Sequence, residues 1–190
     1  PYYPEGFKPV PILVTDQFVR AVRGGVGDCK TAGNYAASLA AQKYAKKLGF
    51  TQVLYLDALE QKYIEEVGTM NMFVQFENEV ATPRLSGTIL PGITRMSVLQ
   101  ILKDWGYNVN ERDIALQEII DAYRNGSLKE LFGTGTAAVI SSIGKLKYND
   151  TELKFSDDSA GELGTKLYKE LTDIHYGRIE DTRNWITYVD

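Results

Sequence analysis

Two strand candidates in the middle of the chain follow each other almost without a connection, and this constrains the fold more than any other feature. Residues 63–67 and 70–76 are separated only by Gly68 and Thr69. Strands joined this closely pair with each other, whereas a doubly wound fold needs a helix between successive strands. The sequence therefore predicts strands that neighbour strands in a mixed sheet or open barrel.

The other segments add short strands and a few helices. Apolar residues recur at helical spacing in four segments: 35–48, 93–105, 116–125 and 161–175. Further strand candidates lie at 52–57, 108–112 and 128–132, and 85–91 is a strand or a loop. Residues 139–143 and 145–148 look like a hairpin that turns at Gly144. We expect an α/β (α+β) fold in which mixed sheets form an open pseudo-barrel flanked by helices.

The first residues predict a linker. Residues 1–11 hold four of the six prolines and two tyrosines, a composition typical of an extended segment. We expect 1–14 to be an interdomain linker with the first strand and 15–190 to be one large domain. This arrangement suggests the later part of a longer protein.

Composition excludes several classes of function. A formal net charge of −4 argues against a basic nucleic-acid surface, and no segment is long and apolar enough to span a membrane. The single cysteine, Cys29, excludes an internal disulfide and fits a reducing cytosol. The single histidine, His175, excludes a multi-histidine metal site. Catalysis would have to use lysine, tyrosine, carboxylates or a cofactor.

A lysine lies in a glycine-rich segment before the first helix candidate. The segment reads GGVGDCKTAGNY, residues 24–35, and contains Lys30. Glycines let the backbone approach a flat ligand, and a lysine amine attacks carbonyls when burial favours its neutral form. Taken alone, the motif fits a surface lysine in a turn better, because lysines are rarely buried.

Two further segments could bind an anion. In LPGITR, residues 90–95, a helix begins after a Pro-Gly turn, so the amides of Ile93 and Thr94 would face outward at the positive helix end. In GTGTA, residues 133–137, successive amides could form a concave anion nest, without the Lys of a nucleotide P-loop. An ordinary helix start and a tight loop between strands are the alternatives.

Consecutive glutamates, Glu65 and Glu66, lie in the strand candidate 63–67. Successive strand residues point to opposite faces, so one carboxylate can enter the core while the other stays in water. A buried carboxylate needs a cationic or protonated partner. A charged strand end is the alternative explanation for this pair.

Together these segments supply the parts of one cofactor site. Pyridoxal 5′-phosphate needs a lysine for its aldehyde, a carboxylate for its pyridine nitrogen and donors for its phosphate. A tyrosine beside the ring hydroxyl would complete the set, and Tyr35 is available. The combination favours this cofactor more than any single motif does.

The chain resembles the C-terminal, cofactor-binding domain of branched-chain amino acid aminotransferases, which are fold-type IV pyridoxal-phosphate enzymes. The resemblance covers nearly all 190 residues and rests on GGVGDCKTAGNY, EEVGTMN, LSGTILPGITR, LFGTGTAAVIS and HYGRIEDTRNW. It implies reversible amino transfer from leucine, isoleucine or valine to 2-oxoglutarate, with ping-pong kinetics, in a cytoplasmic homodimer. It also implies an N-terminal domain, which this chain lacks, so we expect the isolated chain to be inactive or nearly so.

Carried over by position, the resemblance implies a role for each motif. Lys30 resembles the Schiff-base lysine, which also moves the proton between the substrate α-carbon and the cofactor C4′. Tyr35 resembles the tyrosine bonded to the ring oxygen, and Glu66 resembles the carboxylate at the pyridine nitrogen. The other positions resemble residues around the phosphate (Ile93, Thr94, Gly135 and Thr136) and around the substrate (Thr69, Thr136 and Ala137).

Three alternatives remain open. Two are enzymes of the same fold, a D-amino acid transaminase and an aminodeoxychorismate lyase. The motif detail and the late HYGRIED segment favour the branched-chain enzyme. The third is a non-catalytic isolated domain.

Overall fold

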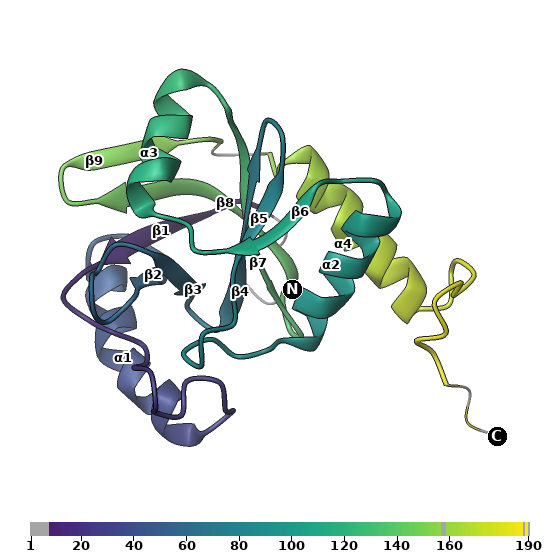
Figure 1. Cartoon of the computed structure of the whole chain (residues 1–190), viewed down its shortest axis with the longest axis horizontal. Coiled ribbons are helices and arrows are strands. Elements are labelled where there is room, and N and C mark those ends of the chain that lie inside the picture. Colours follow the sequence, from purple (N-terminus) through teal and green to yellow (C-terminus); the bar gives the residue numbers. More distant parts are fainter. Residues whose placement is uncertain (1–7, 157–158, 188, 190) are drawn as a thin grey trace.

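The computed structural model describes residues 8–156, 159–187 and 189, and these residues form nine strands and four helices (Figure 1). In chain order the elements are β1 (Val10–Thr15), α1 (Ala32–Lys47), β2 (Gln52–Leu56), β3 (Ile64–Val67), β4 (Met70–Phe76), β5 (Val80–Pro83), α2 (Ile93–Asp104), β6 (Val109–Arg112), α3 (Leu116–Asn125), β7 (Leu128–Gly135), β8 (Val139–Tyr148), β9 (Thr151–Lys154) and α4 (Glu162–His175).

Six of the strands close into a barrel. They follow the order β3-β2-β1-β8-β7-β4, and β3 also pairs with β4. β1 runs parallel to β2 and β8, whereas the pairs β3–β4, β4–β7 and β7–β8 are antiparallel. The predicted mixed sheet with flanking helices is confirmed, and the β3–β4 pairing closes the barrel that we expected to be open.

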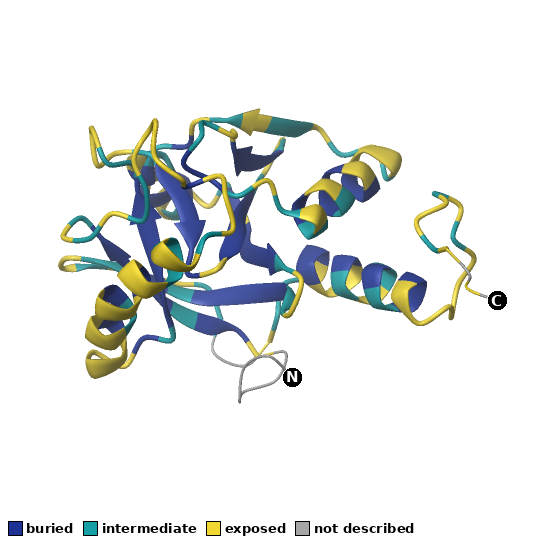
Figure 2. Ribbon diagram, turned by 90° about the horizontal axis from the view of Figure 1, so that it is seen from below, coloured by how far each residue is buried: buried dark blue, intermediate teal, exposed yellow. Residues whose placement is uncertain are grey.

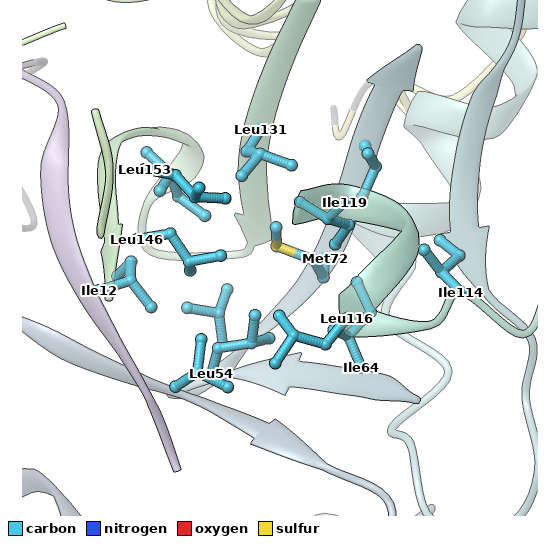
Figure 3. Packing of buried hydrophobic residues seen from close by; sticks show 14 of the residues in the cluster. Ile12, Leu54, Ile64, Met72, Ile114, Leu116, Ile119, Leu131, Leu146 and Leu153 are labelled. Atoms are coloured by element: carbon cyan, nitrogen blue, oxygen red, sulfur yellow. The ribbon is translucent and has the colours of Figure 1, made fainter. Parts of the chain in front are cut away.

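The barrel interior is an apolar core. Alternate strand residues point inward, among them Ile12 of β1, Leu54 of β2 and Met72 of β4 (Figure 3). Leu116 and Ile119 of α3 belong to the same cluster, so this helix packs onto the interior core. Each such side chain contributes about 1.5–3 kcal/mol when it is removed from water.

The outward-facing residues of the same strands are also buried, because helices cover them (Figure 2). Tyr55 of β2 packs with Ala45 of α1, and Leu167 of α4 belongs to the cluster of Phe73 and Phe132. The two phenylalanine rings stack with their centroids 5.2 Å apart. Burial on both faces explains why β2 and β4 are apolar runs without alternation.

One predicted turn is wrong. We expected residues 139–148 to turn at Gly144, but β8 continues without interruption and forms its hairpin with β9. Gly144 serves a close approach: a Cβ there would lie 2.1 Å from the carbonyl oxygen of Ser156. The glycine therefore marks packing between backbones, which sequence cannot distinguish from a turn.

The first strand begins inside the segment that we predicted to be a linker. Val10 and Pro11 belong to β1, which lies between β2 and β8, and the carbonyl of Pro11 accepts a hydrogen bond from the amide of Thr51 (2.9 Å). Residues 1–7 lie outside the described residues. The other predicted helices and strands are present with ends shifted by up to three residues, and β5 and β9 were not predicted.

A buried carboxylate on β7 holds the start of α4. Glu130 accepts hydrogen bonds from the amides of Leu163 and Gly164, both at 3.0 Å. A Cβ at Gly161 would lie 1.9 Å from the Glu130 carboxyl carbon, so glycine leaves room for this contact. Burial raises the pKa of Glu130 to about 7, and the two amides oppose that rise.

We expect Glu130→Ala to lower the free energy of unfolding by about 1–3 kcal/mol, because two first-turn amides of α4 lose their acceptor. The folded pKa lies above that of the unfolded chain, so the contribution of Glu130 is complete below about pH 4.5 and declines as the pH rises through about 7. Urea denaturation should therefore give a larger loss at pH 5 than at pH 8. Lys129→Ala, at the exposed neighbouring position, is the control; an equal loss in both variants contradicts this role.

Candidate active site

The residues predicted from sequence surround one cavity, at the end of the barrel where the β3–β4 and β7–β8 turns lie. Its volume is about 280 Å³. All the predicted site residues line it, namely Lys30, Tyr35, Glu66, Thr69, Ile93, Thr94, Gly135, Thr136 and Ala137. Six further residues complete the lining: Met70, Asn71, Leu90, Gly92, Thr134 and Ala138.

The sheet register brings three polar residues of this cavity into one row. A two-residue turn, with Gly68 at φ +62°, joins β3 to β4 and sets Glu66 opposite Asn71. Asn71 in turn pairs with Thr134 of β7. The Thr134 hydroxyl is buried and has no hydrogen-bond partner among the described residues. A buried hydroxyl without a partner is costly, so it is suited to a polar ligand group.

Glu66 is the most densely bonded group of the cavity. Its Oε1 accepts hydrogen bonds from Asn71 Nδ2 (3.0 Å) and from the Leu90 amide (2.9 Å). Its Oε2 lies 2.5 Å from Nε of Arg20. Burial raises the pKa of Glu66 to about 7, while Arg20 and the Leu90 amide oppose the rise. All three partners donate, so they favour the ionised carboxylate.

Arg20 is the functional residue that sequence reasoning missed. Its side chain is only 7% exposed, and Nη1 donates to the carbonyls of Gly27 (3.1 Å) and Thr88 (2.5 Å). A Cβ at Gly27 would lie 2.6 Å from the Thr88 carbonyl oxygen, so glycine permits this approach. Arg20 therefore joins the glycine-rich loop and the loop before α2 to Glu66. The only available signal was the rule that a buried carboxylate needs a cation.

Lys30 and Tyr35 reach the cavity from the start of α1. Asn34 closes the preceding loop, because its Nδ2 donates to the carbonyls of Val26 (2.7 Å) and Cys29 (3.0 Å). Tyr35 is half-buried, but Lys30 is exposed. The sequence argument for a reactive amine assumed burial, which the described residues do not supply.

The start of α2 forms one wall of the cavity. The amides of Ile93 and Thr94 have no acceptor within the helix, and the helix dipole adds positive potential beside them. A Cβ at Gly92 would lie 2.2 Å from Asn71 Oδ1, so only glycine leaves the Asn71 side chain in place. The buried Arg95 fixes this helix, because its Nη2 donates to the Pro83 carbonyl (3.0 Å) and to a carboxylate of β6 (2.8 Å).

Two expectations need correction. The anion nest predicted over residues 133–137 does not include its first three residues, because Gly133 and Gly135 lie in β7. A Cβ at Gly133 would lie 2.9 Å from Met70 Cε, so this glycine allows close packing. Glu65, which we expected to stay in water if Glu66 was buried, is itself only 6% exposed.

Within the described part of the chain, no group of three or more His, Cys, Asp or Glu side chains could hold a metal ion. None of the helices in that part has the length and apolar character needed to cross a membrane.

We expect Arg20→Met to lower the free energy of unfolding by about 3–5 kcal/mol at pH 8, because it leaves a buried carboxylate without its cation. Loss of Arg20 raises the pKa of Glu66 further, so the carboxyl is neutral below that pKa and the loss should shrink at pH 5.

Urea denaturation at both pH values checks this expectation. Adding Glu66→Gln to Arg20→Met should recover most of the lost stability, and Arg124→Met at an exposed position serves as the control. A loss that is equal at both pH values, or that the second substitution does not reduce, contradicts the account.

Comparison with known proteins places this site in a family. The family model for amino-transferase class IV matches residues 1–146. A branched-chain-amino-acid aminotransferase 2 of Bacillus subtilis is 54% identical over 188 residues, which are 99% of this chain and 52% of that protein. A probable branched-chain-amino-acid aminotransferase of Staphylococcus aureus is 53% identical over 97% of this chain and 51% of its own length.

Solved structures agree with this assignment. A branched-chain amino acid aminotransferase from Thermoproteus uzoniensis, crystallised with norvaline, has a TM-score of 0.80 at 26% identity, over 98% of this chain and 57% of that one. This chain thus spans about half the length of the curated relatives that it matches. With most of its residues matched by the family model, the chain belongs to the class IV aminotransferases.

Proposed function

We propose that the chain is the cofactor-binding part of a branched-chain amino acid aminotransferase, which transfers the amino group of leucine, isoleucine or valine to 2-oxoglutarate. The observation that carries the proposal is the bonding of Glu66 to Arg20 and Asn71 in the same cavity as Lys30 and the first amides of α2. The names of the relatives in Bacillus subtilis and Staphylococcus aureus support the substrate class.

The cavity residues fit pyridoxal 5′-phosphate as the cofactor. Glu66 suits a protonated pyridine nitrogen, because its three donors favour a carboxylate at that end of the cavity. The unpartnered Thr134 hydroxyl and the α2 amides offer donors at another wall. Another solved branched-chain amino acid aminotransferase, 27% identical to this chain, is complexed with N-(5′-phosphopyridoxyl)-L-glutamate, a cofactor–substrate compound of this kind.

We assign the remaining residues to the cofactor and the substrate by their place in the cavity. Tyr35 would donate to the ring oxygen. The phosphate would be held by Ile93, Thr94, Gly135 and Thr136, and the substrate carboxylate would be bound beside Thr69, Thr136 and Ala137.

The chemistry divides between the cofactor and the chain. When bound, pyridoxal 5′-phosphate supplies an electron sink that stabilises negative charge at the substrate α-carbon. Glu66 keeps a proton on the ring nitrogen, which strengthens that sink. The Nζ atom of Lys30 accepts the α-proton and returns it.

We further propose that the complete protein is a cytoplasmic homodimer whose N-terminal domain completes the substrate pocket. The support is the resemblance stated above and the length of the curated relatives, of which this chain spans about half.

We expect titration with pyridoxal 5′-phosphate to give a saturable visible absorbance, and borohydride reduction to fix the cofactor on Lys30. Mass spectrometry of the digested chain locates the attachment. Lys30→Ala should reduce the retained cofactor to background. Lys43→Ala, at an exposed position of α1, controls for non-specific reaction of surface lysines. Equal labelling of wild type and Lys30→Ala would overturn the role of Lys30.

We expect this chain alone to turn over leucine and 2-oxoglutarate at close to the background rate, because the matched relatives are about twice as long. A coupled glutamate assay with saturating cofactor measures this rate. Robust turnover that disappears in Lys30→Ala would show that these residues suffice for catalysis and would contradict this expectation.

A further inference from the structure

Both glutamates of β3 are buried, on opposite faces of the strand. Glu66 lines the cavity described above, whereas Glu65 lines a second cavity of about 590 Å³. Their exposed fractions are 2% and 6%. The proposed reaction uses Glu66 alone, so Glu65 is a buried acid without an assigned role.

Thr88 connects the two acids through one residue. Its hydroxyl donates to Glu65 Oε1 at 2.5 Å, and its carbonyl accepts the bond from Arg20 Nη1 at 2.5 Å. Arg20 in turn pairs through Nε with Glu66. The chain of contacts therefore runs Glu65, Thr88, Arg20, Glu66.

This cluster holds two buried carboxyl groups and one buried cation. Burial raises the pKa of both acids, the charge of Glu65 raises the pKa of Glu66 further, and Arg20 opposes the rise in both. Two carboxylates beside one cation in a poorly solvated site are unfavourable, so the cluster binds a proton over part of the pH range around neutrality.

The hydrogen bonds differ between the two acids. Both oxygens of Glu66 accept from donors, so a proton on Glu66 would compete with those bonds. Glu65 accepts one bond from Thr88, and its Oε2 is buried without a hydrogen-bond partner in the described structure. A proton on Glu65 displaces no donor, which favours Glu65 as its holder when Glu66 is ionised.

Other charged groups also surround Glu65 and belong in the balance. They come from the loop after β1 (Arg20 and Arg23), the turn after β2 (Asp57 and Glu60), the end of β5 (Arg84) and the turn after β6 (Asp113), together with Tyr63 before β3. Asp57 accepts four backbone amides, and Asp113 pairs with Arg84. Arg20 is the member of this group that contacts Glu66.

We propose that Glu65 and Glu66 form one coupled acid pair across β3, in which Glu65 is a positioning residue whose charge sets how strongly Glu66 binds a proton. The inference rests on the proposed function only for its consequence, which is that Glu65 tunes the anion that faces the cofactor nitrogen.

Carbon-13 NMR of the chain without cofactor, labelled at the glutamate carboxyl carbons, tests the coupling. Glu66→Gln and Glu65→Gln identify the two signals by their absence. Glu65→Gln keeps the size and the Thr88 acceptor but removes a charge, so the midpoint of Glu66 should fall by about one pH unit. Glu60→Gln removes an exposed carboxylate from the same second cavity and should leave the midpoint unchanged. An unchanged Glu66 midpoint in Glu65→Gln overturns the proposal.

Thr88→Val provides a second test in which both carboxyl groups remain. Without the hydroxyl, ionised Glu65 loses its donor, so its midpoint should rise while that of Glu66 falls. If neither midpoint moves, the proposal is wrong. A merely structural role would change unfolding without shifting either titration. Because these titrations contain no cofactor, a failure of cofactor binding would contradict the proposed function and would not alter their outcome.

Discussion

The contact between Arg20 and Glu66 organises this end of the barrel. A buried carboxylate is tolerated only with a cation and well-placed donors, and Glu66 has one cation and two N–H donors. The guanidinium also accepts no bonds of its own, so its remaining N–H groups need carbonyl partners. Gly27 and Thr88 supply them, and for that reason two loops from distant parts of the sequence converge at β3.

The barrel supplies the rigid side of the same arrangement. Closure through the β3–β4 turn sets Glu66 beside Asn71, and the pairing of β4 with β7 brings Thr134 next in the row. These positions follow from register, so they change only if strands re-pair. By contrast, Lys30 lies in a loop at the start of α1 and is exposed. The anionic end of the site is therefore better fixed by the described residues than its amine end.

Local patterns carried much of the fold. Apolar periodicity predicted all four helices, and the Gly68-Thr69 turn predicted the hairpin that closes the barrel. The error at Gly144 arose because glycine serves both tight turns and close backbone packing, and only the fold distinguishes these uses.

The candidate site was predictable where a residue acts through its own local motif, as Ile93 does at the start of α2. It was not predictable where a residue acts through a distant partner. Arg20 lies in a segment without helical or strand periodicity, and its importance depends on the fold bringing it to Glu66. The burial of Glu65 was missed for the same reason, because Thr88 comes from a loop that follows two strands later.

A crystal structure of the chain soaked with pyridoxal 5′-phosphate is the most direct test of the account. The account expects the pyridine nitrogen within hydrogen-bond distance of a Glu66 carboxylate oxygen that still contacts Arg20. It also expects the phosphate at the first amides of α2. A cofactor whose ring nitrogen faces away from Glu66, or which binds outside the cavity lined by Lys30 and Tyr35, would contradict it.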